Sequence, residues 1–241
     1  MENNNQTEQT VKSTDTNQGV NMLSSIPNQM MEIILRPVQF YSSSMQKTGG
    51  YVEPLVFMVV MAVVAALVMA ITGLIGLGPT GAMAMGFGGI IMLPILVAIF
   101  GFVGAAIAYF IWKIMGSDED FETAYRCVAY SYAYAPVAML VAGIPYLGTL
   151  ISTFWPMALL AIASIYVHQR SIKASWAVFG ILGLVMLLMG WGAERTGKQM
   201  TSDLEGWSRE MEQKYGDPDD MTPEEAAKAA SEMLKRMQKE K

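Results

Sequence analysis

Charged side chains are scarce in this sequence, and one long stretch has none at all. Only 15% of its 241 residues are Asp, Glu, Lys or Arg, whereas soluble domains usually carry about a quarter. None of the 16 basic and 21 acidic residues lies between Glu53 and Lys113. A loop or a soluble surface of that length would carry charge, so the sequence predicts that this region lies in lipid.

The sequence is equally poor in side chains that bind transition metals or form disulfides. Cys127 is its single cysteine and His168 its single histidine. One thiol excludes an intrachain disulfide, and together with one imidazole it excludes a structural zinc site, so we expect no cofactor. The net charge of −5 comes mainly from residues 118–122 and from the tail after Trp191, which argues against nucleic acid as a partner.

The N-terminus, residues 1–25, lacks the basic flank and the short apolar core of a secretion signal. It is rich in Asn, Gln and Thr and has almost no apolar side chains to bury. Because no burial offsets the entropy lost on ordering, we predict that this segment is disordered and stays in the cytoplasm.

Residues 26–46 have the pattern of a short amphipathic segment on the bilayer surface. Proline cannot donate the helical hydrogen bond, so we expect the helix to end at Pro37. The apolar side consists of Met30, Ile33, Ile34, Pro37, Phe40 and Tyr41.

Residues 47–192 contain five stretches that approach the length of a membrane span. A hydrocarbon core of about 30 Å needs about 20 apolar residues in helix, because unpaired backbone groups in lipid cost several kcal/mol each. We therefore predict an all-α, polytopic membrane protein with a bundle of five transmembrane helices. The stretches are Leu55–Leu77, Gly88–Trp112 with an interruption at Pro94, Tyr125–Ile144, which is the most polar, Leu147–Val167 and Ala174–Trp191.

Basic residues alternate between the predicted links. Residues 76–88 and 145–149 contain no Lys or Arg, whereas 113–126 and 168–173 contain both. The positive-inside rule then puts the charged links and the N-terminus in the cytoplasm and, after five spans, the C-terminus outside. Nine Lys and Arg residues after Trp191 oppose this orientation, but long tails translocate regardless of charge.

The tail, residues 193–241, is predicted to be soluble and to form two amphipathic helices separated by GDPDD. Thr222, Pro223 and Glu225 make a capping box with proline at the first helical position of the second helix. In the first helix, apolar residues recur at helical spacing: Leu204, Trp207, Met211 and Tyr215.

The third predicted span contains the most polar run of any span. Its hydroxyl groups need partners or water inside the bilayer, so the run predicts a cavity or a gate, with the proline loosening the helix. The alternative is an interfacial aromatic belt with a packed kink. The candidate residues are Tyr130, Ser131, Tyr132, Tyr134 and Pro136.

The charged links predict a polar cytoplasmic face that is either a docking surface for a cytosolic partner or simply solvated. Residues 117–120 are expected to cap the third helix, and Glu122 to pair with the arginine four positions later. The candidate docking residues are Asp118, Glu119, Asp120, Arg126, His168, Arg170 and Lys173.

Little in the sequence points to an enzyme or to an ion-coupled carrier. His168 has no base to orient it and no neighbouring nucleophile, and the hydroxyls of the spans have no base to face them. No carboxylate lies within a span, whereas proton-coupled transport usually needs an ionisable residue at membrane depth.

Small residues four positions apart occur in three of the spans, where they let helix backbones approach closely. They are Ala62, Ala66 and Ala70, then Gly104 and Ala108, then Ala129 and Ala133.

The order of these features resembles the Yip-one domain family, five-span membrane proteins named for their interaction with Ypt and Rab GTPases. The resemblance covers about residues 30 to 190. It implies a five-helix membrane protein with a cytoplasmic N-terminus. The polar N-terminus and the lack of the eukaryotic Asp-Leu-Tyr-Gly-Pro run are more similar to a bacterial member, which implies a bacterial cytoplasmic (inner) membrane. The matching residues before and in the first span are Ile34, Leu35, Arg36, Pro37, Phe40, Tyr41, Met45, Gly49, Tyr51 and Pro54; those further along are Phe121, Tyr125, Arg126, Pro136, Ile144, Pro145, Gly148, Trp155, His168, Ser171, Lys173 and Ala174.

Two functions are compatible with this pattern. The first is a non-enzymatic scaffold or interaction protein that binds membrane lipid and a membrane-protein or cytosolic partner; self-association into a homo-oligomer stays open. The alternative is a permeation, transport or lipid-moving protein that uses the polar third span.

Overall fold

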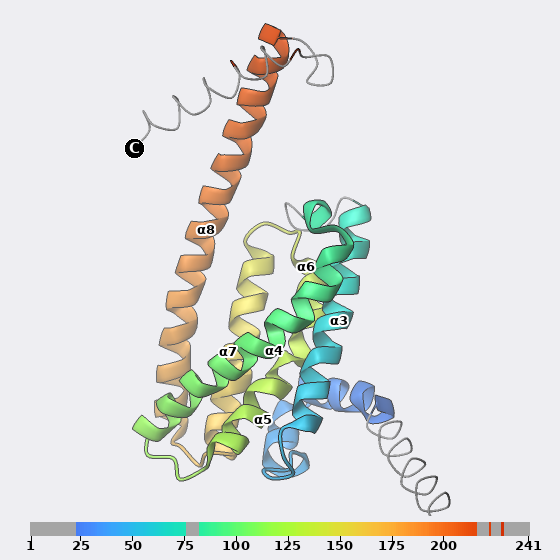
Figure 1. Ribbon diagram of the computed structural model, residues 1–241. Helices are drawn as coiled ribbons and strands as arrows, with labels where there is room; N and C mark the ends of the chain where they lie inside the picture. Colours follow the sequence, from blue (N-terminus) through green and yellow to red (C-terminus); the bar gives the residue numbers. More distant parts are fainter. Residues whose placement is uncertain (1–22, 76–81, 216–221, 223–227, 229–241) are drawn as a thin grey trace, which may run out of the picture. The chain divides into compact units, whose positions relative to one another are not determined.

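Helices make up all the regular structure in the part of the chain that the computed structural model describes, residues 23–75, 82–215, 222 and 228. The chain divides into two units, Met1–Leu188 and Met189–Lys241, and the first contains the helix bundle (Figure 1). Most of the predicted disordered N-terminus and nearly all of the predicted second tail helix lie outside the described residues. Within the N-terminal segment, a helix is already present from residue 23.

Within the described residues, four helices are long and apolar enough to cross a membrane, and they coincide with four of the predicted spans. Within α4 the apolar part is Ile91–Ile114, and within α8 it is Ile172–Gln199. Many large apolar side chains on these helices are exposed. Exposed apolar surface of this extent is unfavourable in water and favourable in contact with lipid. The chain is therefore an integral membrane protein. The helices are α3 (Val52–Leu74), α4 (Ala82–Ile114), α7 (Leu147–Tyr166) and α8 (Ile172–Tyr215).

The third predicted span is not one helix but three short pieces. They are α5 (Phe121–Ser131), the 3₁₀ turn η2 (Tyr132–Tyr134) and α6 (Ala135–Val141). Pro136 has no N–H to donate to the carbonyl of Tyr132, so the α-helical ladder stops and the chain tightens to 3₁₀ geometry. None of the pieces reaches the length of a span, and the five-span count is not reproduced among the four apolar helices.

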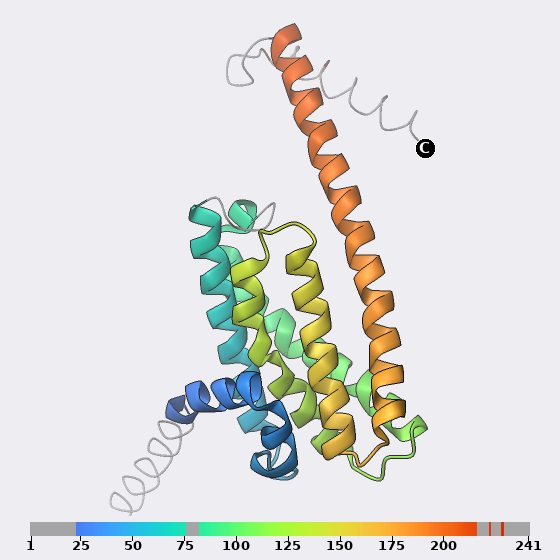
Figure 2. The same ribbon diagram turned by 180° about the vertical axis from the view of Figure 1, so that it is seen from behind.

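The broken segment nevertheless lies inside the bundle. Helices α5 and α6 pack on α3 and α7, and α5 also packs on α4. Residues Thr123–Ser131 are all buried, so α5 is enclosed on every side. In Figures 1 and 2, α5 lies near the end where α3 begins, and α6 lies near the opposite end.

The predicted interruption at Pro94 is wrong. Helix α4 continues through Pro94, because a membrane helix loses one hydrogen bond there without being forced to stop. Helix α8 continues from Ile172 to Tyr215 without a break at Trp191, so its membrane part and the first predicted tail helix are one element.

The small residues lie where helices meet. Ala62 and Ala66 of α3, Ala108 of α4, and Ala129 and Ala133 of the broken segment are all buried. Ala70 is only half-buried. Buried alanines allow close approach of the backbones, so packing stabilises the bundle without bulky core residues.

The segment before α3 breaks at proline, as predicted. A helix over residues 23–35 is followed by α2 (Pro37–Gln39) and the π-helical turn η1 (Phe40–Ser44). Phe40 packs edge-to-face on Tyr130, and the Tyr41 hydroxyl donates to the carbonyl of Cys127 at 3.2 Å. Burial raises the pKa of Tyr41 well above its ordinary value, so this hydroxyl stays a donor. The segment is therefore fastened to the bundle.

Candidate functional site

The three charged links meet at one end of the bundle, where we call residues 45–53, 115–126 and 167–173 the polar cap. The guanidinium of Arg126, which is 0% exposed, lies at its centre. Arg126 Nε donates to the carbonyl of Gln46 at 2.6 Å and Nη1 to that of Gly50 at 2.8 Å. Nη2 donates to Glu53 Oε2 at 2.6 Å. Arg126 thus fixes the segment that enters α3.

Lys47 joins all three links. Its Nζ lies 2.5 Å from Glu119 Oε1 and donates to the carbonyl of Val167 at 3.2 Å. The Thr123 hydroxyl donates to the Lys47 carbonyl at 3.3 Å. A fourth contact comes from Arg170, whose Nη1 donates to the carbonyl of Met115 at 3.1 Å. The cap is therefore a connected network and not a set of independent loops.

Glu122 does not pair with Arg126, contrary to the sequence-based prediction. It accepts instead from the N–H of Gly50 at 2.7 Å, while Arg126 takes Glu53 as its carboxylate partner. The predicted helix cap is confirmed: Asp120 accepts from the N–H of Thr123 at 2.9 Å. This hydrogen bond holds the pKa of the Asp120 carboxyl below its ordinary value.

His168 has polar neighbours, although the sequence analysis predicted neither an orienting group nor a nucleophile beside it. Its Nδ1 lies 2.8 Å from Ser117 Oγ, and its Nε2 lies 3.9 Å from Cys127 Sγ. The ring stacks on Trp112 with the centroids 3.8 Å apart. Burial lowers the pKa of His168 to about 3, assisted by the positive charges of Lys47 and other cap residues, so the ring is neutral. Ser117 and Cys127 are 51 and 41 residues away from His168 in sequence, so no local sequence pattern predicts these contacts.

Burial divides the predicted docking residues into two groups. Asp118, Asp120 and Lys173 are exposed, and Glu119 and Arg170 are partly exposed, so a partner would meet their charges; docking by them stays a prediction. Arg126 and His168 are 0% and 2% exposed and do not belong to an outer face. The reason is that their polar atoms are used inside the cap.

A cavity of about 360 Å³ lies between α4, the broken segment, α7 and α8. Three of the predicted cavity residues line it, namely Ser131, Tyr132 and Tyr134. Tyr130 lies elsewhere, between Phe40 and Phe57. Pro136 is buried at the start of α6 and acts on the backbone. A role of this cavity in gating stays a prediction.

The described residues contain no group of three or more His, Cys, Asp or Glu side chains able to hold a metal ion. The Ser117–His168 pair has the atoms of a nucleophile and a base, but both side chains are buried. Neither the cavity above nor a second one between α7 and α8 is lined by them. The pair therefore joins the link before α5 to the link after α7.

Replacing Arg126 by methionine tests the centre of the cap. We expect Arg126→Met to destabilise the protein by about 3 kcal/mol, because Glu53 and two carbonyls lose their partner at a buried site. Cys127 is the single cysteine and is buried, so the reaction of a thiol-specific dye during heating in detergent reports unfolding directly. Lys198→Met is the control: Lys198 pairs with Glu194 one turn away on an exposed helix surface, and its loss costs less than about 0.5 kcal/mol. Equal melting temperatures for the two variants would contradict the central role of Arg126.

The neutral His168 makes stability fall at acid pH. An unfolded histidine binds a proton below a pKa of about 6.5, whereas the folded one stays neutral down to about 3. Between these values the unfolded state binds more protons, so stability rises with pH and is lost as pH falls. We expect a loss of about 2 kcal/mol between pH 7 and pH 5, measured by thermal unfolding with circular dichroism. The His168→Gln variant, which cannot titrate at this position, should lose less stability between pH 7 and pH 5. An equal loss of stability in both proteins would refute the role of His168 in the acid sensitivity.

Comparison with known families agrees with this architecture. A family model described as the Yip1 domain matches residues 31–193, more than half of the chain. The matched region begins before Pro37 and ends within α8, so it includes the polar cap and the cavity. No curated protein and no solved structure matches the chain. The resemblance inferred from the order of sequence features is confirmed, and this chain belongs to the Yip1 domain family.

Proposed function

We propose that this protein is a non-enzymatic membrane scaffold, in which the bundle contacts lipid and other membrane proteins while the polar cap recruits a cytosolic partner. The observation that carries the proposal is the cap itself. Lys47, Glu119 and Arg170 join three links that are far apart in the sequence. A surface held in one conformation before binding loses less entropy when a partner docks, and this favours recognition.

The outer charges of the cap give this surface its chemistry. Asp118 and Asp120 are exposed on the link before α5, and Lys173 is exposed at the start of α8. Charges of both signs in fixed positions select a partner with the complementary pattern and reject others. We therefore infer that the docking face consists of these three residues with Glu119 and Arg170 at its edge.

We further propose that the broken segment crosses the membrane as the third of five passages. The pieces α5, η2 and α6 follow one another without a gap from Phe121 to Val141, and they are enclosed by α3, α4 and α7. Neighbouring helices supply the apolar surroundings that the segment itself lacks. Five passages leave the N-terminus in the cytoplasm and the C-terminus outside, in a bacterial inner membrane.

The passage count has a direct test. With a tag at the C-terminus, external protease should remove the tag from intact spheroplasts and leave the N-terminus untouched. An N-terminal tag on the same chain is the matched control. Protection of the C-terminal tag would show an even number of passages and would exclude the broken segment as a span.

A second candidate function is permeation or lipid movement through the bundle. The cavity lined by Ser131, Tyr132 and Tyr134 favours it, since polar groups at membrane depth often line a path. Solute flux or lipid exchange above the empty-liposome rate would distinguish this function from a static scaffold.

The docking face is tested by crosslinking in intact membranes followed by affinity purification. We expect the full-length protein to yield a reproducible partner, and Asp118→Asn combined with Lys173→Gln to reduce its recovery about fivefold, because each complementary charge pair contributes on the order of 1 kcal/mol or less. Glu194→Gln with Lys198→Gln is the control, since it also neutralises one acidic and one basic residue, neither of which belongs to the cap. Recovery of the protein as a monomer without partner or lipid would refute the scaffold, and an equal loss in the control would refute the docking face.

A further inference from the structure

The cavity between α4, the broken segment, α7 and α8 has one polar side within an apolar enclosure. Five of its lining residues carry a hydroxyl group, and they come from the broken segment and from α7. Its remaining walls are aliphatic or aromatic, and none of the lining residues is Asp, Glu, Lys, Arg or His. The hydroxyl-bearing residues are Ser131, Tyr132, Tyr134, Ser152 and Thr153.

Three of these hydroxyls have hydrogen-bonding capacity that the protein leaves unused. Ser131 donates to the carbonyl of Val128 at 2.7 Å, and Ser152 donates to a carbonyl one turn earlier. Among the hydrogen bonds of the described residues, none involves the hydroxyl of Tyr132, Tyr134 or Thr153. A hydroxyl without a partner in an apolar environment costs on the order of 1–3 kcal/mol, so a ligand that offers an oxygen atom would bind favourably there.

We propose that this cavity binds a neutral lipid that carries a hydroxyl or an ester carbonyl, and that diacylglycerol is the chemical class that fits. The absence of charge among the lining residues disfavours a phosphate or ammonium group inside the cavity, because neither would find a counter-ion. A pure hydrocarbon would leave the hydroxyls unpaired. A glycerol ester supplies both acceptors and a donor without net charge.

The size of the cavity limits how much of the lipid enters. Its volume of about 360 Å³ lies near the lower end of the range of ligand pockets, about 300–1,000 Å³. It therefore holds the glycerol ester region and part of one acyl chain, whereas the second chain stays in the bilayer. The aliphatic walls that contact the chain are Ile107, Ile111, Leu160, Leu182 and Met186.

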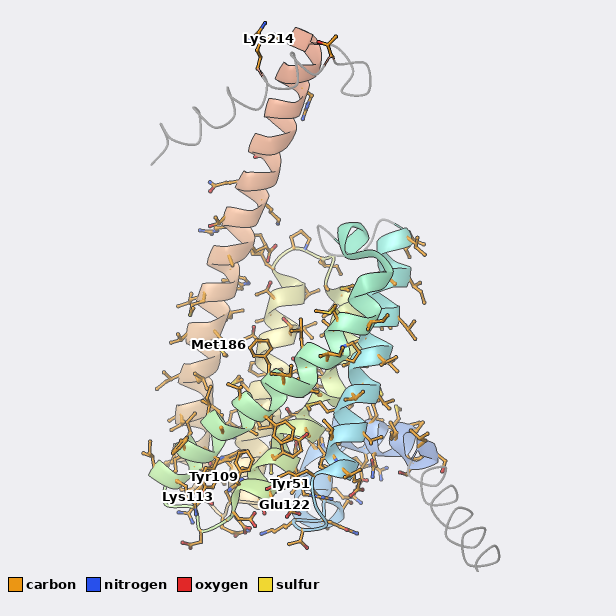
Figure 3. All side chains as sticks on the ribbon, in the orientation of Figure 1. Tyr51, Tyr109, Lys113, Glu122, Met186 and Lys214 are labelled. Atoms are coloured by element: carbon orange, nitrogen blue, oxygen red, sulfur yellow. The ribbon has the colours of Figure 1, made fainter. Side chains whose placement is uncertain are left out.

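The cavity has an entrance from the lipid. Ile107 of α4 is 57% exposed and Met186 of α8, labelled in Figure 3, is 48% exposed, so residues at its edge face the surroundings of the bundle. A second cavity of about 220 Å³ lies between α7 and α8 and shares Thr153, Met157 and Phe179 with the first. A lipid chain can therefore enter laterally without passing the polar cap.

This inference rests neither on the docking face nor on flux through the bundle. A protein that holds one lipid and moves nothing satisfies it, and so does one that recruits no partner. Its failure would leave partner recovery by the full-length protein unchanged, and failure of the docking face would leave lipid labelling unchanged.

Photo-crosslinking tests the site. The full-length protein in phosphatidylcholine nanodiscs is irradiated with a diacylglycerol that carries a diazirine in one acyl chain, and labelled peptides are mapped by mass spectrometry. We expect labels in the lining segments of α4, α7 and α8. Unlabelled dioleoylglycerol should compete for them, whereas dioleoyl phosphatidic acid and hexadecane should not.

Two variants decide whether the hydroxyls and the volume matter. Tyr132→Phe with Tyr134→Phe keeps the rings and removes two hydroxyls, so dioleoylglycerol should compete about fivefold less well, as expected for the loss of one or two net hydrogen bonds. Gly104→Leu places a side chain in the cavity and should abolish its labels; a Cβ at position 104 meets only Val128 Cγ1, at 3.9 Å, which is an ordinary van der Waals contact.

Tyr109→Phe is the matched control, since Tyr109 is a half-buried tyrosine of α4 outside the cavity (Figure 3). Dioleoylglycerol should compete for labelling of this variant as well as it does for the natural sequence. Circular dichroism should show helical spectra for all variants. Equal competition by hexadecane and dioleoylglycerol would overturn the proposal, and so would labels that persist in Gly104→Leu. If the tyrosine pair fails to fold, Gly104→Leu alone decides the outcome.

Discussion

The hydrogen bonds of the buried Arg126 guanidinium are the interaction on which the polar-cap end of the bundle depends. A fully enclosed cation is tolerated only when its donors are satisfied, and here two carbonyls and the Glu53 carboxylate satisfy them. Two of the acceptors belong to the segment that leads into α3, and the third, Glu53, lies in the first turn of α3. The position of the first membrane helix relative to α5 is therefore set by hydrogen bonds of fixed direction, which apolar packing alone does not provide.

Helix α5 connects this cap to the cavity. Ser131 follows Arg126 by five residues, or about 7.5 Å at the helical rise of about 1.5 Å per residue. Because every residue from Thr123 to Ser131 is buried, α5 has no freedom to rotate without moving its neighbours. The 3₁₀ turn that follows it then presents Tyr132 and Tyr134 to the cavity. Helix α5 therefore carries the central arginine of the cap, Arg126, and ends at a residue that lines the cavity, Ser131.

Local signals in the sequence predict most of the fold and little of the site. Hydropathy over about 20 residues identifies α3, α4, α7 and α8. Pro37 predicts the helix break before α3, and Asp120 predicts the N-terminal cap of α5. The partners of Arg126 and His168 are 41 to 80 residues away. Glu122 lies four residues before Arg126, a spacing at which helical side chains can pair. Only the assembled bundle therefore shows that Arg126 binds a different carboxylate. The broken segment illustrates the same limit, since its neighbours and not its own composition determine its burial.

The sequence separation within the cap also determines when it can form. Lys47 precedes α3, whereas Val167, whose carbonyl it meets, is 120 residues later, after α7. During synthesis the Lys47–Val167 contact therefore cannot form until the end of α7 has emerged from the ribosome. Until then, apolar burial and the Arg126 hydrogen bonds to Gln46, Gly50 and Glu53 hold the early helices. A chain truncated before α7 would keep the Arg126 contacts and lack the Lys47–Val167 contact that joins the third link to the cap.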